Sequence, residues 1–97
     1  MADAGTVYIP ERDARYEAWV KQNPSGYVIN AHKAAAYPMK WHRADCTYIQ
    51  GGPRSVEGDY IKACSLNPAT LATWAHTRRE PLEYCQVCLN KWLKERR

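Results

Sequence analysis

The cysteine pair in Cys85-Gln86-Val87-Cys88 constrains the fold of this chain more than any other feature. Two thiolates with this spacing reach one metal ion from a tight turn, and the amphipathic segment after Cys88 would place a helix N-terminus beside their negative charge. Upstream, His42 and Cys46 form a second pair with three residues between them. Three thiolates and one imidazole form a common structural zinc site. We therefore predict one structural Zn²⁺ bound by His42, Cys46, Cys85 and Cys88.

The remaining cysteine, Cys64, is an alternative to His42 as the fourth ligand. It lies at the end of an expected strand and would make an all-cysteine site if it replaced His42. The other interpretation is that Cys64 is a small buried apolar residue, which is the usual role of a free cysteine. A redox pair at Cys85 and Cys88 is disfavoured, because such pairs follow a strand in a parallel βαβ unit and this chain is patterned differently.

The cysteines also bear on the cellular compartment. No segment approaches the roughly 20 consecutive apolar residues that cross a bilayer. The first residues are small and polar, with Asp3 where a signal peptide would carry positive charge. We therefore expect a cytoplasmic protein without a membrane partner. Four cysteines in that reducing compartment are better explained as metal ligands than as two disulfides.

A length of 97 residues predicts a single domain, with residues 1–10 as a flexible N-terminal segment. Much of the apolar content consists of seven Tyr and four Trp, and there is no Phe. A core of this size is marginal on its own, so a metal crosslink would contribute substantially to stability.

Apolar periodicity predicts an α+β fold, with about three helices and one short antiparallel sheet of about three strands. Three segments repeat apolar residues at i, i+3 and i+4, each including a Trp, which is typical of helices that pack on a core. Asn67-Pro68 is a favourable helix start, with Asn67 as the N-cap. Residues 31–38 are either a helical turn or a loop, and Pro81 closes a loop. The expected helices are 11–22, one starting at 68, and 86–97, and the expected strands are 27–30, 39–42 and 59–64.

Three segments together carry a family resemblance: residues 26–30, 41–46 and 85–88. The arrangement resembles a treble-clef zinc finger and is similar to small zinc-binding modules of bacterial and phage proteins, some attached to nucleases or to readers of modified DNA. The chain departs from the usual treble clef by having His42 and Cys46 in place of the first CxxC, and by a long insertion that carries Cys64. The resemblance implies a role in contacting nucleic acid or in docking to a protein.

Several classes of enzyme are disfavoured by the motifs. A zinc deaminase needs HxE and PCxxC elements, but no histidine here has that glutamate and Tyr84 precedes Cys85. The three histidines are too scattered for an HNH nuclease site. Four protein ligands leave a zinc ion no position for water, and there is no P-loop or GxSxG motif. We therefore expect a non-catalytic protein without a small-molecule substrate.

The positive charge indicates the expected partner. The formal net charge is +4 and the isoelectric point is near 9.0, with most basic residues from Arg43 onward. If the fold gathers them beside the zinc, they form a surface for phosphate groups. We therefore expect binding to nucleic acid, DNA first, through Arg43, Arg54, Arg78, Arg79, Lys91 and Lys94. The alternatives are a merely solvated basic face, or a protein-protein interaction adaptor whose exposed Trp or Tyr residues anchor a partner.

Overall fold

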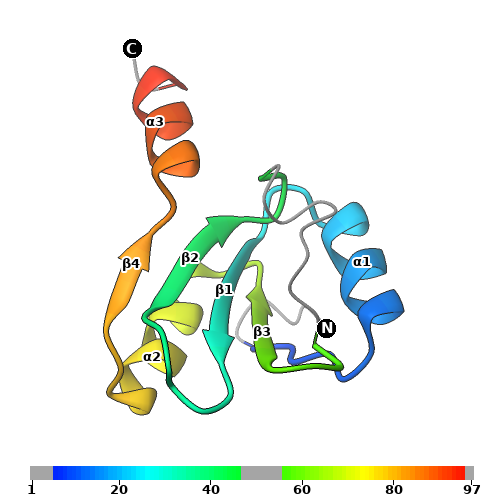
Figure 1. Ribbon diagram of the computed structural model, residues 1–97. Coiled ribbons are helices and arrows are strands. Elements are labelled where there is room, and N and C mark those ends of the chain that lie inside the picture. Colours follow the sequence, from blue (N-terminus) through cyan, green and yellow to red (C-terminus); the bar gives the residue numbers. More distant parts are fainter. Residues whose placement is uncertain (1–5, 47–55, 96–97) are drawn as a thin grey trace.

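The computed structural model describes residues 6–46 and 56–95 (Figure 1). Within these residues three helices and one sheet confirm the expected α+β class. Along the chain the elements are α1 (Asp13–Gln22), β1 (Tyr27–His32), β2 (Met39–Arg43), β3 (Tyr60–Ser65), α2 (Pro68–Arg78), β4 (Leu82–Tyr84) and α3 (Gln86–Glu95).

The described strands form one sheet in the order β3-β1-β2-β4. β1 lies between β2 and β3 and is antiparallel to both, whereas β4 pairs with β2 in parallel. The sheet is therefore mixed and not purely antiparallel as expected, and Leu82–Tyr84 adds a fourth strand that the sequence did not predict. β4 has only three residues, too few to show a period of two, and a proline directly before it indicates a turn.

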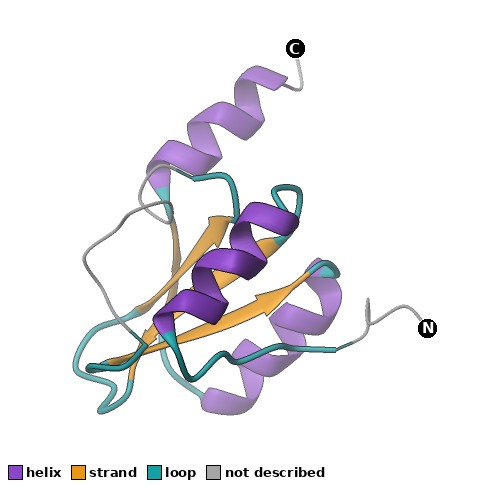
Figure 2. Cartoon of the chain, turned by 90° about the vertical axis from the view of Figure 1, so that its right-hand side faces the viewer, coloured by secondary structure: helices purple, strands orange, loops and turns teal. Residues whose placement is uncertain are grey.

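The sheet is covered on both faces. On one face α1 contributes the buried side chains of Tyr16 and Val20, and on the other α2 contributes those of Leu71 and Ala75. Figure 2 shows α1 nearest the viewer and α2 farther away. The apolar stripes predicted for these two helices are thus confirmed as core-facing.

Strand pairing fixes which side chains face each core. Val28 of β1 lies opposite His42 of β2, and Ile29 lies opposite Trp41. Directly opposed residues share a face of the sheet, and consecutive residues alternate between faces. Since Val28 belongs to the core under α1 and Ile29 to the core under α2, His42 faces the α1 side and Trp41 faces the α2 side.

The helix ends follow local capping chemistry. The Asn67 side chain accepts hydrogen bonds from the backbone N–H groups of Ala69 and Thr70, which confirms the predicted N-cap of α2. α1 begins at Asp13, two residues later than expected, and the Asp13 carboxylate accepts a hydrogen bond from the Val56 N–H at 2.8 Å. Among the described residues, no helix has the length and apolar character that crossing a lipid bilayer requires.

The segment between β1 and β2 is a turn rather than a helix. β1 continues to His32, whose Nδ1 accepts a hydrogen bond from the Ala34 N–H at 3.1 Å. Ala35 then adopts a positive φ of 56°. The side chain of His32 packs edge-on against the rings of Tyr37 and Tyr60. These contacts hold the connection close to the end of the sheet.

Part of the N-terminal segment is paired with the sheet. Tyr8 exchanges two backbone hydrogen bonds with Cys64 of β3, at 2.8 and 2.9 Å. This pairing covers the outer edge of β3 with a short stretch of the segment that the sequence led us to expect as flexible. Residues 1–5 of that segment lie outside the described residues.

Gly26 lies where α1 packs closely against the start of β1. A Cβ at this position would lie 2.7 Å from Cη2 of Trp19 and 3.2 Å from the carbonyl oxygen of Asn23. We expect Gly26→Ala to lower the free energy of unfolding by about 1–3 kcal/mol, because the Trp19 ring must move. Urea denaturation measures this, with Ser25→Ala at the exposed neighbouring position as the control. Equal stabilities of the two variants would contradict it.

Candidate metal centre

Four buried side chains gather where the end of β2 meets the start of α3. They are His42, Cys46, Cys85 and Cys88, and one ligand atom from each lies within 4.8 Å of all the others. The structure thus brings together the four residues that the sequence predicted as ligands. The cluster could hold a metal ion.

Backbone hydrogen bonds position the two halves of the cluster. The Cys85 N–H donates to the Trp41 carbonyl at 2.9 Å, which continues the parallel pairing of β4 with β2. The Cys46 N–H donates to the Arg43 carbonyl at 3.1 Å and closes the turn after β2. The Arg43 N–H donates to Sγ of Cys88 at 3.3 Å. These hydrogen bonds hold the turn after β2 close to the start of α3, so that the four side chains of the cluster lie together.

The sulfur spacing fits a shared metal ion. Sγ of Cys46 and Sγ of Cys85 are 3.9 Å apart. A disulfide would place them at about 2.05 Å, whereas two sulfurs at about 2.3 Å from a tetrahedral zinc ion are separated by about 3.8 Å. Both cysteines are free thiols in the structure.

The first turn of α3 favours a thiolate at Cys85. Burial raises the pKa of this thiol, but hydrogen bonds from the backbone N–H groups of Cys88 and Val87 and from the thiols of Cys46 and Cys88 lower it, and the net shift is downward. Amide groups at a helix N-terminus carry partial positive charge and stabilise an adjacent anion. Cys85 is thus suited to bind a cation.

Cys88 has the opposite tendency. Burial is the main cause that raises the pKa of Cys88 to about 12; the hydrogen bond from the Arg43 N–H lowers this pKa, and the nearby thiols of Cys46 and Cys85 raise it. Several thiolates cannot share so small a buried volume without a compensating positive charge. A bound divalent cation would supply that charge.

Cys64 lies outside the cluster. Val28 pairs with Cys64 on one side and with His42 on the other. Two strand spacings, about 10 Å, therefore separate Cys64 from His42. Its thiol lies 3.7 Å from the carbonyl oxygen of Lys62, and burial raises its pKa to about 12. The position of Cys64 is that of a buried core residue.

The predicted basic residues fall into two groups. Arg43 and Lys91 lie at the cluster, and both contact the carboxylate of Asp45, at 3.3 and 3.2 Å. Lys94 is exposed on the same helix as Lys91. Arg78 and Arg79 lie at the end of α2, and β4 separates them from α3 (Figure 1). Arg54 lies outside the described residues.

A pocket that sequence reasoning missed lies next to the cluster. Its volume is about 580 Å³, and its lining includes Tyr27, Trp41, Arg43, Tyr84 and Cys88. The sequence analysis assigned the Trp residues of the three expected helices to packing and did not identify a pocket at Trp41, which lies on an expected strand. The alternation of Met39-Lys40-Trp41-His42 was the available signal, because it places Trp41 and His42 on opposite faces of the sheet.

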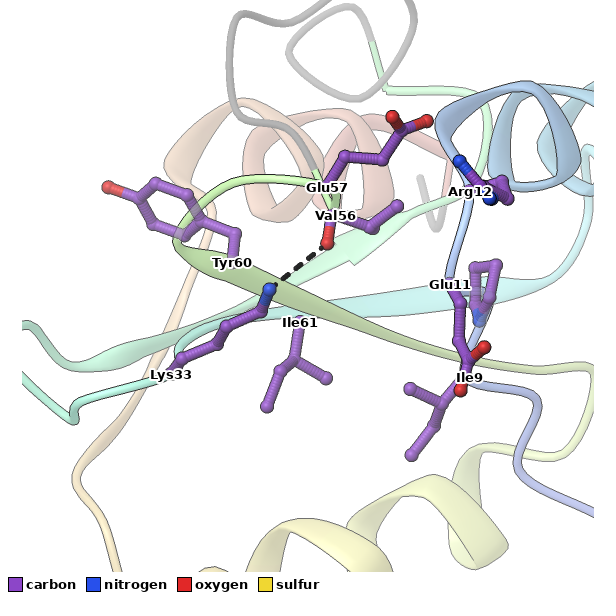
Figure 3. A pocket seen from close by; sticks show the side chains of 9 residues that line it. Ile9, Glu11, Arg12, Lys33, Val56, Glu57, Tyr60 and Ile61 are labelled. Carbon is purple, nitrogen blue, oxygen red and sulfur yellow. Dashed lines mark hydrogen bonds between the residues drawn. The ribbon is translucent and has the colours of Figure 1, made fainter.

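A second hollow, beside β3, is structural in character (Figure 3). Nζ of Lys33 donates there to the carbonyl oxygens of Val56 and Gly58, at 3.2 and 2.5 Å. Lys33 thereby satisfies backbone acceptors in the loop before β3.

Comparisons of the chain with protein-family models, with curated proteins and with solved structures find no match.

The same substitution at two buried cysteines tests the ligand set. We expect Cys88→Ser to lose the bound metal and to unfold, because the free energy of metal binding is part of the free energy of folding. Cys64→Ser should keep its metal, because Cys64 is not in the cluster. Elemental analysis and circular dichroism of both purified proteins measure the outcome. A Cys88→Ser protein that stays folded without metal would contradict the assignment.

Acid should release the metal. With a pKa near 12 the metal-free Cys88 thiol is protonated at neutral pH, so binding must displace at least this proton. The apparent affinity should therefore rise with pH, and fall at least about tenfold for each unit of acidification between about pH 8 and pH 6. Competition with a chelator measures it. An affinity independent of pH would contradict this prediction.

Proposed function

We propose that the ion is zinc, held in a closed structural site. Three sulfurs and one imidazole nitrogen are a preferred donor set for zinc, and four protein ligands complete a tetrahedron. Such an ion has no position left for a water molecule or a substrate. The proposed role of the protein is therefore binding rather than catalysis.

We infer that the partner is nucleic acid, bound at the corner formed by the end of β2 and by α3. The observation that carries this proposal is that Arg43 and Lys91 share one carboxylate, Asp45, beside the metal cluster. Two basic side chains thus lie beside this carboxylate, and Lys94 adds another positive charge on the exposed surface of α3. A local excess of positive charge attracts phosphate groups.

The placement of α3 supports this inference. In Figures 1 and 2 the helix extends away from the sheet, and an ion bound by Cys85 and Cys88 would fix its first turn. The contact of Lys91 with Asp45 adds a second attachment. Exposed side chains on a helix held in this way, including Asn90, can approach a partner without obstruction from the sheet.

Arg78 and Arg79 have a secondary place in the proposal. The guanidinium of Arg78 forms an ion pair with Glu80 at 2.6 Å and lies 5.5 Å from the centre of the Trp74 ring. These contacts give Arg78 a local structural role. Arg79, at the C-cap of α2, could contact phosphates of a strand that runs along β4.

A charge-matched pair of variants tests the proposal. We expect Lys91→Gln/Lys94→Gln to weaken binding to DNA and RNA oligonucleotides, because each phosphate that is no longer neutralised keeps its counterions. The slope of log affinity against log salt should become shallower by about 0.7–0.9 for each such phosphate. Arg15→Gln/Lys21→Gln removes the same charge from exposed positions on α1 and is the control.

The titration uses metal-loaded protein with duplex DNA, modified duplex DNA and single-stranded RNA at two salt concentrations. Equally weakened binding by the two double variants would show that only net charge matters and would contradict a specific site. Failure of the wild type to bind any of the three would instead favour the protein-interaction adaptor. The observation behind that second candidate is the exposure of Tyr84 and Val87 near the cluster, at 57% and 43%.

A further inference from the structure

The pocket beside the metal cluster contains a row of aromatic rings. The ring centres of Tyr27 and Trp41 are 5.7 Å apart, and those of Trp41 and Tyr84 are 6.0 Å apart. The three residues occupy neighbouring positions on β1, β2 and β4, on the face of the sheet opposite His42. The row therefore crosses the sheet from strand to strand.

Not all of this aromatic surface is used in packing. Tyr27 and Trp41 are partly buried against the core under α2, but Tyr84 is 57% exposed at the edge strand. The rings of Trp41 and Tyr84 are inclined by 42°, so they do not stack in parallel on each other. The pocket they line has a volume of about 580 Å³, within the roughly 300–1,000 Å³ of small-molecule sites.

Positive charge lies at one end of the aromatic row. Arg43 lines the same pocket and shares the carboxylate of Asp45 with Lys91. Lys40 and Glu83 pair with each other at 3.5 Å, and strand alternation places them on the other face of the sheet, outside this pocket. A ligand with a planar ring and an adjacent anionic group would match this polarity, with the ring on the aromatic side chains and the anion towards Arg43.

We propose that this pocket binds one unpaired nucleobase, with a neighbouring phosphate at Arg43. The inference rests on the proposed function and specifies the form of nucleic acid: a single strand, a loop, or a duplex with one base extruded. Bases in an intact duplex are stacked between their neighbours and cannot reach a pocket in a sheet face. Aromatic side chains on a sheet that stack with unpaired bases are an established means of single-strand recognition.

The experiment compares two oligonucleotides with equal numbers of phosphates. One is a single strand of about eight nucleotides, and the other is the same backbone with abasic residues throughout. We expect the wild type to bind the strand with bases roughly 5- to 150-fold more tightly, as stacking of one base predicts. Fluorescence anisotropy of the labelled oligonucleotides measures both affinities.

Variants of two exposed tyrosines locate the effect. Tyr84→Ala should remove most of the preference for the strand with bases over the abasic strand. Tyr84→Phe keeps the ring and should behave as the wild type. Tyr37→Ala, at a tyrosine that is 62% exposed near the other end of β2, is the matched control. Metal content and thermal unfolding show whether each variant is folded.

The outcomes distinguish failure of the base pocket from failure of nucleic-acid binding as a whole. Equal wild-type affinity for both strands, with both weakened by Lys91→Gln/Lys94→Gln, would overturn the base pocket and leave nucleic-acid binding intact. Tighter binding to an intact duplex than to the single strand would also overturn the pocket. Absence of binding to every oligonucleotide would overturn both proposals. A base preference that disappears in Tyr84→Ala and persists in Tyr37→Ala supports the pocket.

Discussion

The convergence of three thiols and one imidazole is the constraint on which the surrounding structure depends. Cys88 is buried with a pKa near 12, and it lies close to two other thiols. Such a group cannot lose its proton at neutral pH unless a cation replaces that proton. The charge of a bound ion would therefore decide whether the turn after β2 and the first turn of α3 stay together. A bound ion would thus give a defined direction to a helix that extends away from the sheet (Figure 1).

Alternation of side chains along β2 directs neighbouring residues to two kinds of surface. His42 and Trp41 are neighbours on β2, yet one faces the metal cluster and the other faces the aromatic pocket. The parallel pairing of β4 then adds one residue to each side: Tyr84 lies beside Trp41, and Cys85 enters the cluster. A register shift of one residue would exchange these positions. The two sites consequently depend on the same short strand.

The clustering of His42, Cys46, Cys85 and Cys88 was predictable because its signal is local. Thiols and an imidazole at short spacings require only a turn and a helix start to converge, and both can be read in the sequence. The exclusion of Cys64 was not predictable, because it depends on Val28 lying between Cys64 and His42 in the sheet. β4 was missed because three residues show no period. The sequence gives the number of basic residues but not the acidic residues that they contact. In the structure Arg78 forms an ion pair with Glu80, whereas Arg43 and Lys91 both contact the carboxylate of Asp45.

The metal cluster and the proposed binding surface share residues, which links folding to function. The backbone N–H of Arg43 donates to Sγ of Cys88, while its side chain lines the aromatic pocket. Cys85 and Cys88 of the cluster also line this pocket, together with Leu89. An ion in the cluster would therefore not need to touch a nucleic acid to control its binding. It would hold Arg43, Tyr84 and α3 at fixed distances, and the gain in affinity would come from a surface that is ordered before the partner arrives.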